Sequence, residues 1–429
     1  MKWRNQLLAL LCLLVFFAFG VLYFKNWVVQ KPFGIILFVG EGLDPARLAA
    51  TRIYAYDAST PLQLDSLSFA ALLKNYSIDS TTPDEAAAAT ALATGRKVKN
   101  GTIGVAPHGK ALANLIQLAR EAGRMTGLVT DSSLTDATAA SFYGHGRAPA
   151  DRQSLALELV ESADIDVVLG GGAADFLGPS KGGTRADTRD LVSELQDAGY
   201  DFVGNLEELE EVPRWRRAKL FGLFSQAELA FGDDEEARVN QPTLGDMVRR
   251  SIELLQFNRG GYLLVVDAGL MRKASEQNDG ERTLLQTLEL DRAIGTALEY
   301  AGTKSMIMVC GDVAIGGMSL NGFPPRDASG AIWFSSTTPE EPSLTWATGP
   351  NGRKPTPAPE AETEGAPVAP TPAPTEPPIT GLHQPAAVYA TTARESAADM
   401  IALGIGPGTE ALRGTMESTR IFEIIQDNL

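Results

Sequence analysis

Apolar runs alternate with amphipathic segments along most of the chain. The first run, FGIILFVG at 33–40, ends in glycine and precedes EGLDPARLAATRIYA, which has helical periodicity. Similar β-rich runs that end in glycine or an acid follow at 125–131, 166–172, 260–269 and 305–312. Alternation of buried strands with helices is typical of a mostly parallel sheet covered on both faces. We therefore predict an α/β fold, a three-layer sandwich with a mostly parallel central sheet.

Acidic residues stand at the carboxyl ends of four predicted strands. They are Glu41, Asp131, Asp267 and Asp312. Functional groups gather at this edge of an open α/β sheet. Together with Glu85 and Asp136, these acids form a candidate site for a hard cation, because Mg²⁺ and Ca²⁺ prefer oxygen ligands. The alternative is that each acid caps the helix after its strand.

The N-terminus carries a long apolar segment, LLALLCLLVFFAFGVLYF at 7–24, without a charge. Its length approaches the roughly 20 residues that span a bilayer and exceeds the core of a signal peptide, about 7–15 residues. Lys2 and Arg4 precede it, so the positive-inside rule places 1–6 in the cytoplasm. We expect a signal-anchor in the cell membrane, single-pass, with an extracytoplasmic body. A cleaved signal peptide is the alternative, and it would leave the body on the same side.

The segment 351–378 is rich in proline, alanine and acid and has little to bury. It predicts a disordered insertion that divides one α/β domain into 25–350 and 379–429. The net charge of −16 argues against nucleic-acid binding, which needs clustered basic residues. Two cysteines exclude a disulfide framework, and the three histidines are not spaced to share one metal ion.

The stretch PDEAAAATALATGRKVKNGTIGV at 83–105 reads as the nucleophile turn of an enzyme. Such a turn usually presents a hydroxyl or a thiol, but here the presenting residue is Glu85. The three hydroxyl residues at 80–82 precede the turn and are weak candidates for a shifted nucleophile.

The order of the motifs resembles the alkaline phosphatase family. Asp84 and Glu85 stand at the family's Asp-Ser pair, Gly40-Glu41-Gly42 at the Gly-Asp-Gly of its first strand, Asp136-Ala137-Thr138 at its Asp-Ala-Thr, and LGGG, LLVVDAG and GPG follow in family order. The matches run from residue 34 to 425. The resemblance implies an alkaline-phosphatase-like sandwich, and a metal-dependent hydrolase that acts on phosphorylated small molecules with two zinc ions and one magnesium ion.

The same resemblance implies which residues would bind these ions. A magnesium-type site would consist of Glu41, Asp136, Thr138 and Asp267, all of which offer oxygen. At positions that the resemblance assigns to zinc ligands, this chain has Arg272, Glu276, Val313 and Glu395 instead. Of the second zinc site it keeps Asp312. The sequence therefore leaves room for Mg²⁺ and gives no expectation of zinc. The family's phosphate-binding arginine is missing, and Arg147 or Arg152 could replace it.

The substitutions favour a catalytically degenerate, membrane-tethered scaffold or binding protein. Glu85 is longer than serine and negatively charged, so it would occupy the space of the phosphate. We further expect Arg272 to stand where a zinc ion would, paired with Glu85, Glu276 or Glu395; the alternative is an Arg272 that points to solvent. An active phosphate monoester hydrolase with altered ligands, or a structural domain without a ligand, remains an alternative function. A homodimer, common in the family, is compatible with the sequence.

Overall fold

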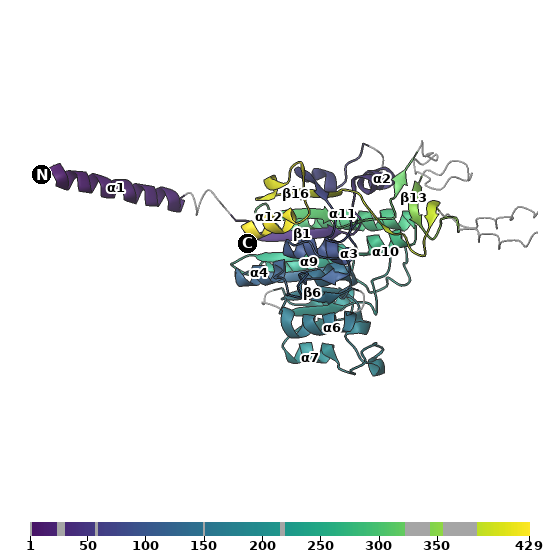
Figure 1. Ribbon diagram of the computed structural model, residues 1–429. Coiled ribbons are helices and arrows are strands. Elements are labelled where there is room, and N and C mark those ends of the chain that lie inside the picture. The colour runs from purple at the N-terminus through teal and green to yellow at the C-terminus, as the bar shows by residue number, and fades with distance from the viewer. Residues whose placement is uncertain are drawn as a thin grey trace, which may run out of the picture.

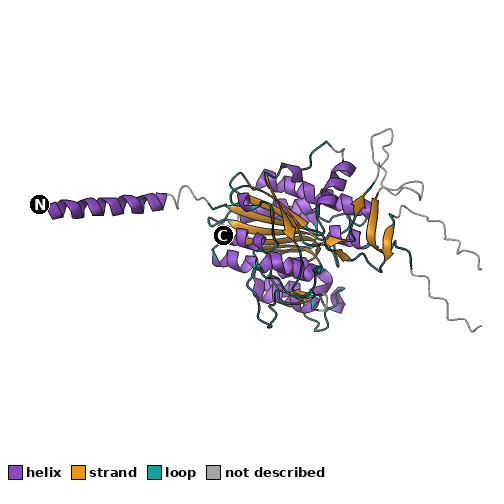
Figure 2. Ribbon diagram, turned by 45° about the horizontal axis from the view of Figure 1, so that its top comes forward, coloured by secondary structure: helices purple, strands orange, loops and turns teal. Residues whose placement is uncertain are grey.

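A ten-stranded sheet runs through the body of the molecule (Figures 1 and 2). The computed structural model describes residues 2–23, 31–55, 59–148, 151–214, 219–321, 344–354 and 384–429. In chain order the strands of the sheet are β1 (Gly34–Gly40), β2 (Phe69–Lys74), β4 (Met125–Ser133), β6 (Val167–Gly171), β7 (Asp201–Val203), β8 (Leu220–Leu223), β9 (Tyr262–Ala268), β10 (Met306–Gly311), β16 (Met400–Ile405) and β17 (Thr415–Glu417).

The sheet is mostly parallel, as predicted. Its spatial order is β17-β2-β16-β10-β1-β9-β4-β6-β8-β7, and only β16 runs antiparallel to its two neighbours. The five strands predicted from the sequence form the contiguous centre of this order, β10-β1-β9-β4-β6. Strands β1 and β9 are buried along their whole length, which explains why they read as unbroken apolar runs.

Helices cover both faces of the sheet and complete the predicted three-layer sandwich (Figure 2). One core contains side chains of α3 (Glu85–Thr94), α4 (Leu115–Glu121), α5 (Ala137–Ser141), α6 (Arg152–Glu158), α7 (Leu191–Asp197) and α12 (Arg420–Asn428). The other contains side chains of α2 (Pro45–Ala55), α8 (Leu206–Glu211), α9 (Leu244–Leu255), α10 (Leu270–Glu276) and α11 (Gly280–Tyr300). Because successive strand residues point to opposite faces, the central strands contribute to both cores, as β1 does with Ile35 and Leu37 on one face and Ile36 and Phe38 on the other.

Short strands pair outside the main sheet. They are β3 (Thr102–Ile103) with β5 (Gly146–Arg147), β11 (Ala314–Ile315) with β15 (Glu395–Ser396), and β12 (Ser319–Leu320), β13 (Leu344–Gly349) and β14 (Ala386–Tyr389) in a third sheet. The chain after the predicted insertion returns to the main sheet, because β16 lies beside β10. Residues 355–378 of that insertion, and His383, lie outside the described residues.

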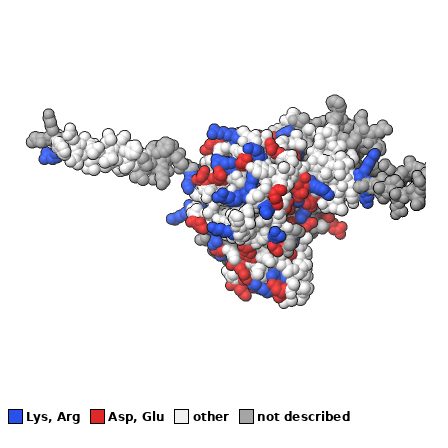
Figure 3. Space-filling view, in the orientation of Figure 1, with Lys and Arg blue, Asp and Glu red and all other residues white. Residues whose placement is uncertain are grey.

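The apolar N-terminal segment forms one helix, α1 (Lys2–Tyr23), which extends from the body in Figure 1. Its 18-residue window Trp3–Gly20 has a mean hydropathy of 1.6. By length and composition this window is long and apolar enough to cross a membrane. A signal sequence near the N-terminus can meet the same test of length and hydropathy, so the helix is compatible with a membrane anchor or with a signal sequence. In Figure 3 it is a white band, whereas blue and red side chains intermingle on the face of the body shown there.

Parallel strands bring the predicted strand-end acids to one edge of the sheet. Asp131 shows what such an acid does when it caps a helix: its Oδ1 accepts a hydrogen bond of 3.0 Å from the backbone N–H of Leu270, at the start of α10. Burial raises the pKa of Asp131 to about 7, although this hydrogen bond opposes the shift. Asp131 therefore hydrogen-bonds to the start of α10, which follows β9, and does not cap the helix after its own strand, α5.

The raised pKa of Asp131 predicts a pH-dependent stability. The folded chain holds this proton up to about pH 7, whereas the unfolded chain releases it near pH ~3.9. Between those values the folded state binds more protons, so stability falls as pH rises, by on the order of 4 kcal/mol in total. Asp131→Asn keeps the acceptor and removes the charge. We expect it to unfold at a higher temperature than the native chain at pH 8 and at nearly the same temperature at pH 4.

Thermal unfolding of both proteins across this pH range measures the effect. Glu121→Gln, at an exposed acid of α4, is the control and should change neither value. Parallel pH profiles for Asp131→Asn and the native chain would contradict the assignment.

Candidate functional site

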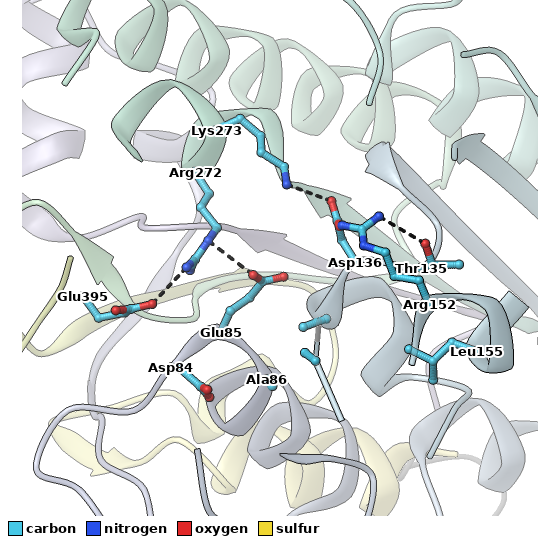
Figure 4. A pocket seen from close by; sticks show the side chains of 12 residues that line it. Asp84, Glu85, Ala86, Thr135, Asp136, Arg152, Leu155, Arg272, Lys273 and Glu395 are labelled. Carbon is cyan, nitrogen blue, oxygen red and sulfur yellow. Dashed lines mark hydrogen bonds and ion pairs between the residues drawn. The ribbon is translucent and has the colours of Figure 1, made fainter. Parts of the chain in front are cut away.

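A cavity of about 270 Å³ opens at the carboxyl edge of the sheet (Figure 4). The beginnings of α3 and α5, the side chains of α6 and α10, and Glu395 of β15 line it. These segments are far apart in sequence. The parallel sheet brings α3, α5 and α10 together because they follow β2, β4 and β9 at the same edge. Charged side chains face one another across this cavity.

The helix α3 places Glu85 at the mouth of this cavity. Asp84 is its N-cap, and the Asp84 carboxylate accepts a hydrogen bond from the backbone N–H of Ala87. The residues of α3 after Glu85 are all buried, so the helix packs closely against its neighbours and presents only its first turn, with Glu85 and Ala86, to the cavity. Glu85 Oε1 accepts a hydrogen bond of 3.1 Å from the backbone N–H of Thr138.

Arg272, on α10, lies at the centre of a carboxylate cluster. Its Nε is 3.3 Å from Glu85 Oε2 and 2.8 Å from Glu276 Oε1, and its Nη2 is 2.9 Å from Glu395 Oε1. Figure 4 shows Glu85 and Glu395 pointing toward the guanidinium. The prediction that Arg272 pairs with at least one of these acids is confirmed, and the solvent-facing alternative is wrong, because only 10% of the side chain is exposed.

The electrostatics of Arg272 follow from this arrangement. Burial alone acts to lower the pKa of Arg272, but Glu85 and Glu276 outweigh it and hold the pKa well above its usual value. The guanidinium is therefore a fixed positive charge, and its planar donors suit carboxylates on more than one side. Its Nη1 is buried without a hydrogen-bond partner.

A second ion-pair cluster surrounds Asp136. Lys273 Nζ lies 3.1 Å from Asp136 Oδ2, and Arg152 Nη2 donates to Asp136 Oδ1. Ser132 Oγ donates to Oδ2 at 2.5 Å. Burial acts to raise the pKa of Asp136, but Lys273 and Arg152 outweigh it and lower the pKa. Asp136 therefore stays ionised, and both of its oxygens have partners.

Four more residues lie beneath this surface with oxygens that lack a partner. They are Glu41 Oε1, Thr138 Oγ1, Asp267 Oδ1 and Asp312 Oδ2. Burial raises the pKa of Glu41 and of Asp267 well above the usual range, and neighbouring carboxylates add to both shifts. Burial also raises the pKa of Asp312 to about 6, against a 2.8 Å hydrogen bond from the backbone N–H of Gly42.

The predicted magnesium-type set is only partly available to a metal ion. Within the described ranges, no group of three or more His, Cys, Asp or Glu side chains is placed to hold one. The carboxylate of Asp136, the fourth residue with a predicted oxygen ligand, is in ion pairs with Lys273 and Arg152. Glu41, Thr138 and Asp267 each retain one buried, unpartnered oxygen, and such oxygens suit a single hard cation.

The remaining predicted residues are the two candidate phosphate-binding arginines, Arg147 and Arg152, and Val313. Arg152 lines the cavity, whereas Arg147 lies on β5 with an exposed side chain and is absent from the lining. Of the two arginines, Arg152 is therefore the one placed to contact a ligand. Val313 is fully buried in a small apolar cluster with Ala88, so it contributes packing in place of a metal ligand.

The sequence interpretation missed Lys273. It follows Arg272 directly on α10, and it provides a second positive charge that faces a different carboxylate, Asp136. A signal was present: neighbouring residues of a helix point about 100° apart, so a Lys-Arg pair after a strand-end acid can serve two acids on one edge.

Comparison with known proteins finds a family model and relatives that match most of this chain. The family model for alkaline phosphatase matches residues 34–429. Alkaline phosphatase H of Pseudomonas aeruginosa is 30% identical over 357 residues, which cover 72% of this chain and 74% of that protein. The alkaline phosphatase of Gadus morhua is 28% identical over 361 residues, which cover 73% and 76%. Some other relatives are longer, and the chain spans 65% of the Gallus gallus tissue-nonspecific isozyme.

Solved structures share the fold. The alkaline phosphatase of the Antarctic bacterium TAB5 superposes with a TM-score of 0.71 at 22% identity, over 93% of this chain and 98% of that one. A cold-active enzyme from Shewanella sp. gives 0.71 at 22% identity, over 92% and 99%. The fold likeness agrees with the match along the sequence, and this chain belongs to the alkaline phosphatase family.

Proposed function

We propose that this chain is a catalytically degenerate member of its family that works as a membrane-tethered scaffold or binding protein. The observation that carries the proposal is the position of Glu85. Its carboxylate stands at the nucleophile position and is held by Arg272 at 3.3 Å and by the backbone N–H of Thr138 at 3.1 Å. A carboxylate held in this way at the nucleophile position repels a phosphate.

Metal chemistry is proposed only for one position. Glu41, Thr138 and Asp267 would hold a single Mg²⁺-type cation through their unpartnered oxygens. A mutant of the TAB5 enzyme is described with Mg bound in its M3 site, which is compatible with a magnesium site in this fold. Such a cation would supply positive charge beneath the pocket. Zinc is not expected, because the positions implied for it carry Arg272, Glu276, Val313 and Glu395.

Tethering would fix which way the pocket faces. The segment after α1 enters the sheet at the amino end of β1, whereas the cavity lies at the carboxyl ends. Ten residues, 24–33, join the helix to β1, and a chain of that length reaches at most about 35 Å. The cavity would therefore face away from the bilayer, toward soluble ligands or partners.

The alternative function is a phosphate monoester hydrolase with altered ligands. Family membership favours it, and so does Arg152, which lines the pocket with 37% of its side chain exposed. This function would require Glu85 to leave Arg272 and attack phosphorus, as the aspartate of some ATPases does.

Hydrolysis of an aryl phosphate separates the two functions. We expect the native chain, with Mg²⁺ or Zn²⁺ added, to release phenol at the rate of a metal-free control, because Glu85 is paired and blocks the phosphate. Glu85→Ala should be equally inactive, and Glu423→Gln, at a remote acid of α12, is the control. Turnover well above background that disappears in Glu85→Ala would establish the carboxylate as a nucleophile.

The state of the N-terminus follows from the apolar helix. We expect the full-length chain to stay in the membrane fraction after a carbonate wash, since 7–24 carries no charge and would span the bilayer. Intact-mass analysis of the mature protein supplies the check. A mature N-terminus beyond residue 18 would show a cleaved signal peptide instead.

Binding of a hard cation should stabilise the fold. At a hundredfold excess over its dissociation constant, Mg²⁺ should add roughly 2.7 kcal/mol to the stability and raise the melting temperature. Thr138→Val removes one free oxygen and should reduce this rise. Asp136→Asn should lower the melting temperature but keep the rise, because Asp136 is committed to Lys273 and Arg152. If neither Mg²⁺ nor Ca²⁺ raises the melting temperature of the native chain, the result would favour the alternative of a structural domain without a ligand.

A further inference from the structure

Three exposed aromatic side chains lie at the edge of the sheet opposite the cavity. Phe33 is 36% exposed, Phe257 56% and Tyr300 39%. Each stands shortly before one of the parallel strands β1, β9 and β10, which lie side by side in the order β10-β1-β9. The amino ends of these strands therefore present an aromatic surface, whereas the cavity lies at the carboxyl ends.

A basic residue lies within four positions of each of these aromatic residues, and all three are exposed: Lys31, Arg259 and Lys304. Arg259 and Lys304 form no ion pair within the described ranges. Glu299 and Asp427 are exposed acids near the same edge, so the surface carries both signs of charge and the aromatic rings distinguish it. Aromatic rings beside Lys or Arg are typical of a membrane–water interface, where the ring lies among the headgroups and the charged group reaches lipid phosphates.

Hydrogen bonds join the segments that carry these side chains. The backbone N–H of Phe33 donates to the carbonyl of Lys304 at 3.0 Å, and that of Tyr262 donates to the carbonyl of Phe33 at 3.1 Å. The buried guanidinium of Arg124 donates to the carbonyls of Phe33 and Asn428, each at 3.0 Å. The spacing of the exposed side chains along this edge is therefore fixed by the sheet.

The apolar helix α1 ends close to this edge along the chain. The described chain resumes at Lys31, eight positions after Tyr23, the last residue of α1. A chain of that length reaches at most about 29 Å. A bilayer spanned by α1 would therefore lie within reach of the amino ends of the strands.

We propose that the amino edge of the sheet is a membrane-contact surface that holds the body against phospholipid headgroups. The rings of Phe257 and Tyr300 enter the headgroup layer, and Arg259 and Lys304 donate to lipid phosphates. The proposal rests on the tethering proposed above, which keeps this edge beside the bilayer. Its consequence is orientation: the cavity points away from the membrane in one pose, whereas a tether alone would let the body turn.

Fluorescence quenching by a labelled lipid measures this contact. The full-length chain, with Cys12→Ala, is placed in nanodiscs of equal parts phosphatidylcholine and phosphatidylglycerol, one chain per disc. A fluorophore is attached at Thr303→Cys, an exposed position of the amino edge, or at Ala397→Cys, an exposed position before the antiparallel strand β16 and thus at the carboxyl edge. Cys310 is buried and stays unlabelled. We expect a spin label on the lipid headgroup to quench the fluorophore at position 303 and to leave that at position 397 unchanged.

Removal of the rings tests which side chains make the contact. Phe257→Ser/Tyr300→Ser should fold, since both rings are exposed, and should lower the quenching at position 303 toward the level at position 397. Val239→Ser/Val388→Ser is the matched control, because these side chains are 66% and 60% exposed and lie before α9 and in β14, away from the amino ends. It should leave the quenching unchanged.

Removal of the basic groups tests the lipid phosphates. Arg259→Gln/Lys304→Gln should also reduce the quenching at position 303. Added salt should weaken it in the native chain, because ions screen the attraction to anionic lipid.

Three results would overturn the contact surface. They are equal quenching at both positions, no quenching at position 303 in discs whose chain has its full mass, and quenching there that neither double variant reduces, since the tether alone would then account for it. A dimer in detergent that Phe257→Ser/Tyr300→Ser dissociates would assign the rings to a second copy of the chain instead.

Failure of the tether is distinguished by the mass of the mature chain. If the N-terminus proves to be cleaved, the mature chain is sedimented with vesicles of the same lipid composition. We expect it to sediment with them, and Phe257→Ser/Tyr300→Ser to lose this binding. A mature chain that stays in the supernatant would refute the surface as well as the tether.

Discussion

The need to balance negative charge at one edge of the sheet governs the site of this protein. A parallel sheet brings the carboxyl ends of its strands together, and here these ends and the adjoining helices carry a dense group of acids. Carboxylates that converge away from water must acquire a counter-charge or a proton. Arg272 supplies the first of these for three acids at once, at distances of 2.8 to 3.3 Å.

The acids resolve this constraint differently at different depths. Near the cavity, Asp136 is held ionised by Lys273 and Arg152, and Glu85 is paired with Arg272. Deeper in the edge, burial dominates and the pKa values of Glu41 and Asp267 rise, so protons take the part that cations take above. Glu41 and Asp267, which have no ion-pair partner among the described residues, each keep one buried oxygen without a hydrogen-bond partner.

This arrangement separates the fold of the family from its chemistry. The sheet, its helical layers and the order of its motifs match alkaline phosphatases along residues 34–429. The scaffold depends on buried apolar strands and on close packing of the small residues of α3, and neither requires a nucleophile. The proposed binding or scaffold role would use the same pocket, which Arg152, Lys273 and the ion-paired Glu85 line.

The sequence by itself determined the architecture and the set of acids. The apolar runs at 33–40, 125–131, 166–172, 260–269 and 305–312 all form central strands, because a strand buried on both faces leaves an unbroken apolar signal. The outer strands β2, β7, β8, β16 and β17 were not recognised, since short length or partial exposure weakens that signal. The motif order also identified Glu85 and the exchange at Arg272.

Only the tertiary structure decided how those residues are paired. Asp131, Asp136 and Asp267 look alike as acids near strand ends, yet one caps a helix, one lies between two cations and one keeps a buried free oxygen. Likewise, nothing in the chain order distinguishes Arg152 from Arg147 or assigns Lys273 to Asp136. The physical reason is that ion pairs and pKa shifts depend on separations of a few ångströms and on burial, and both are set where distant segments meet.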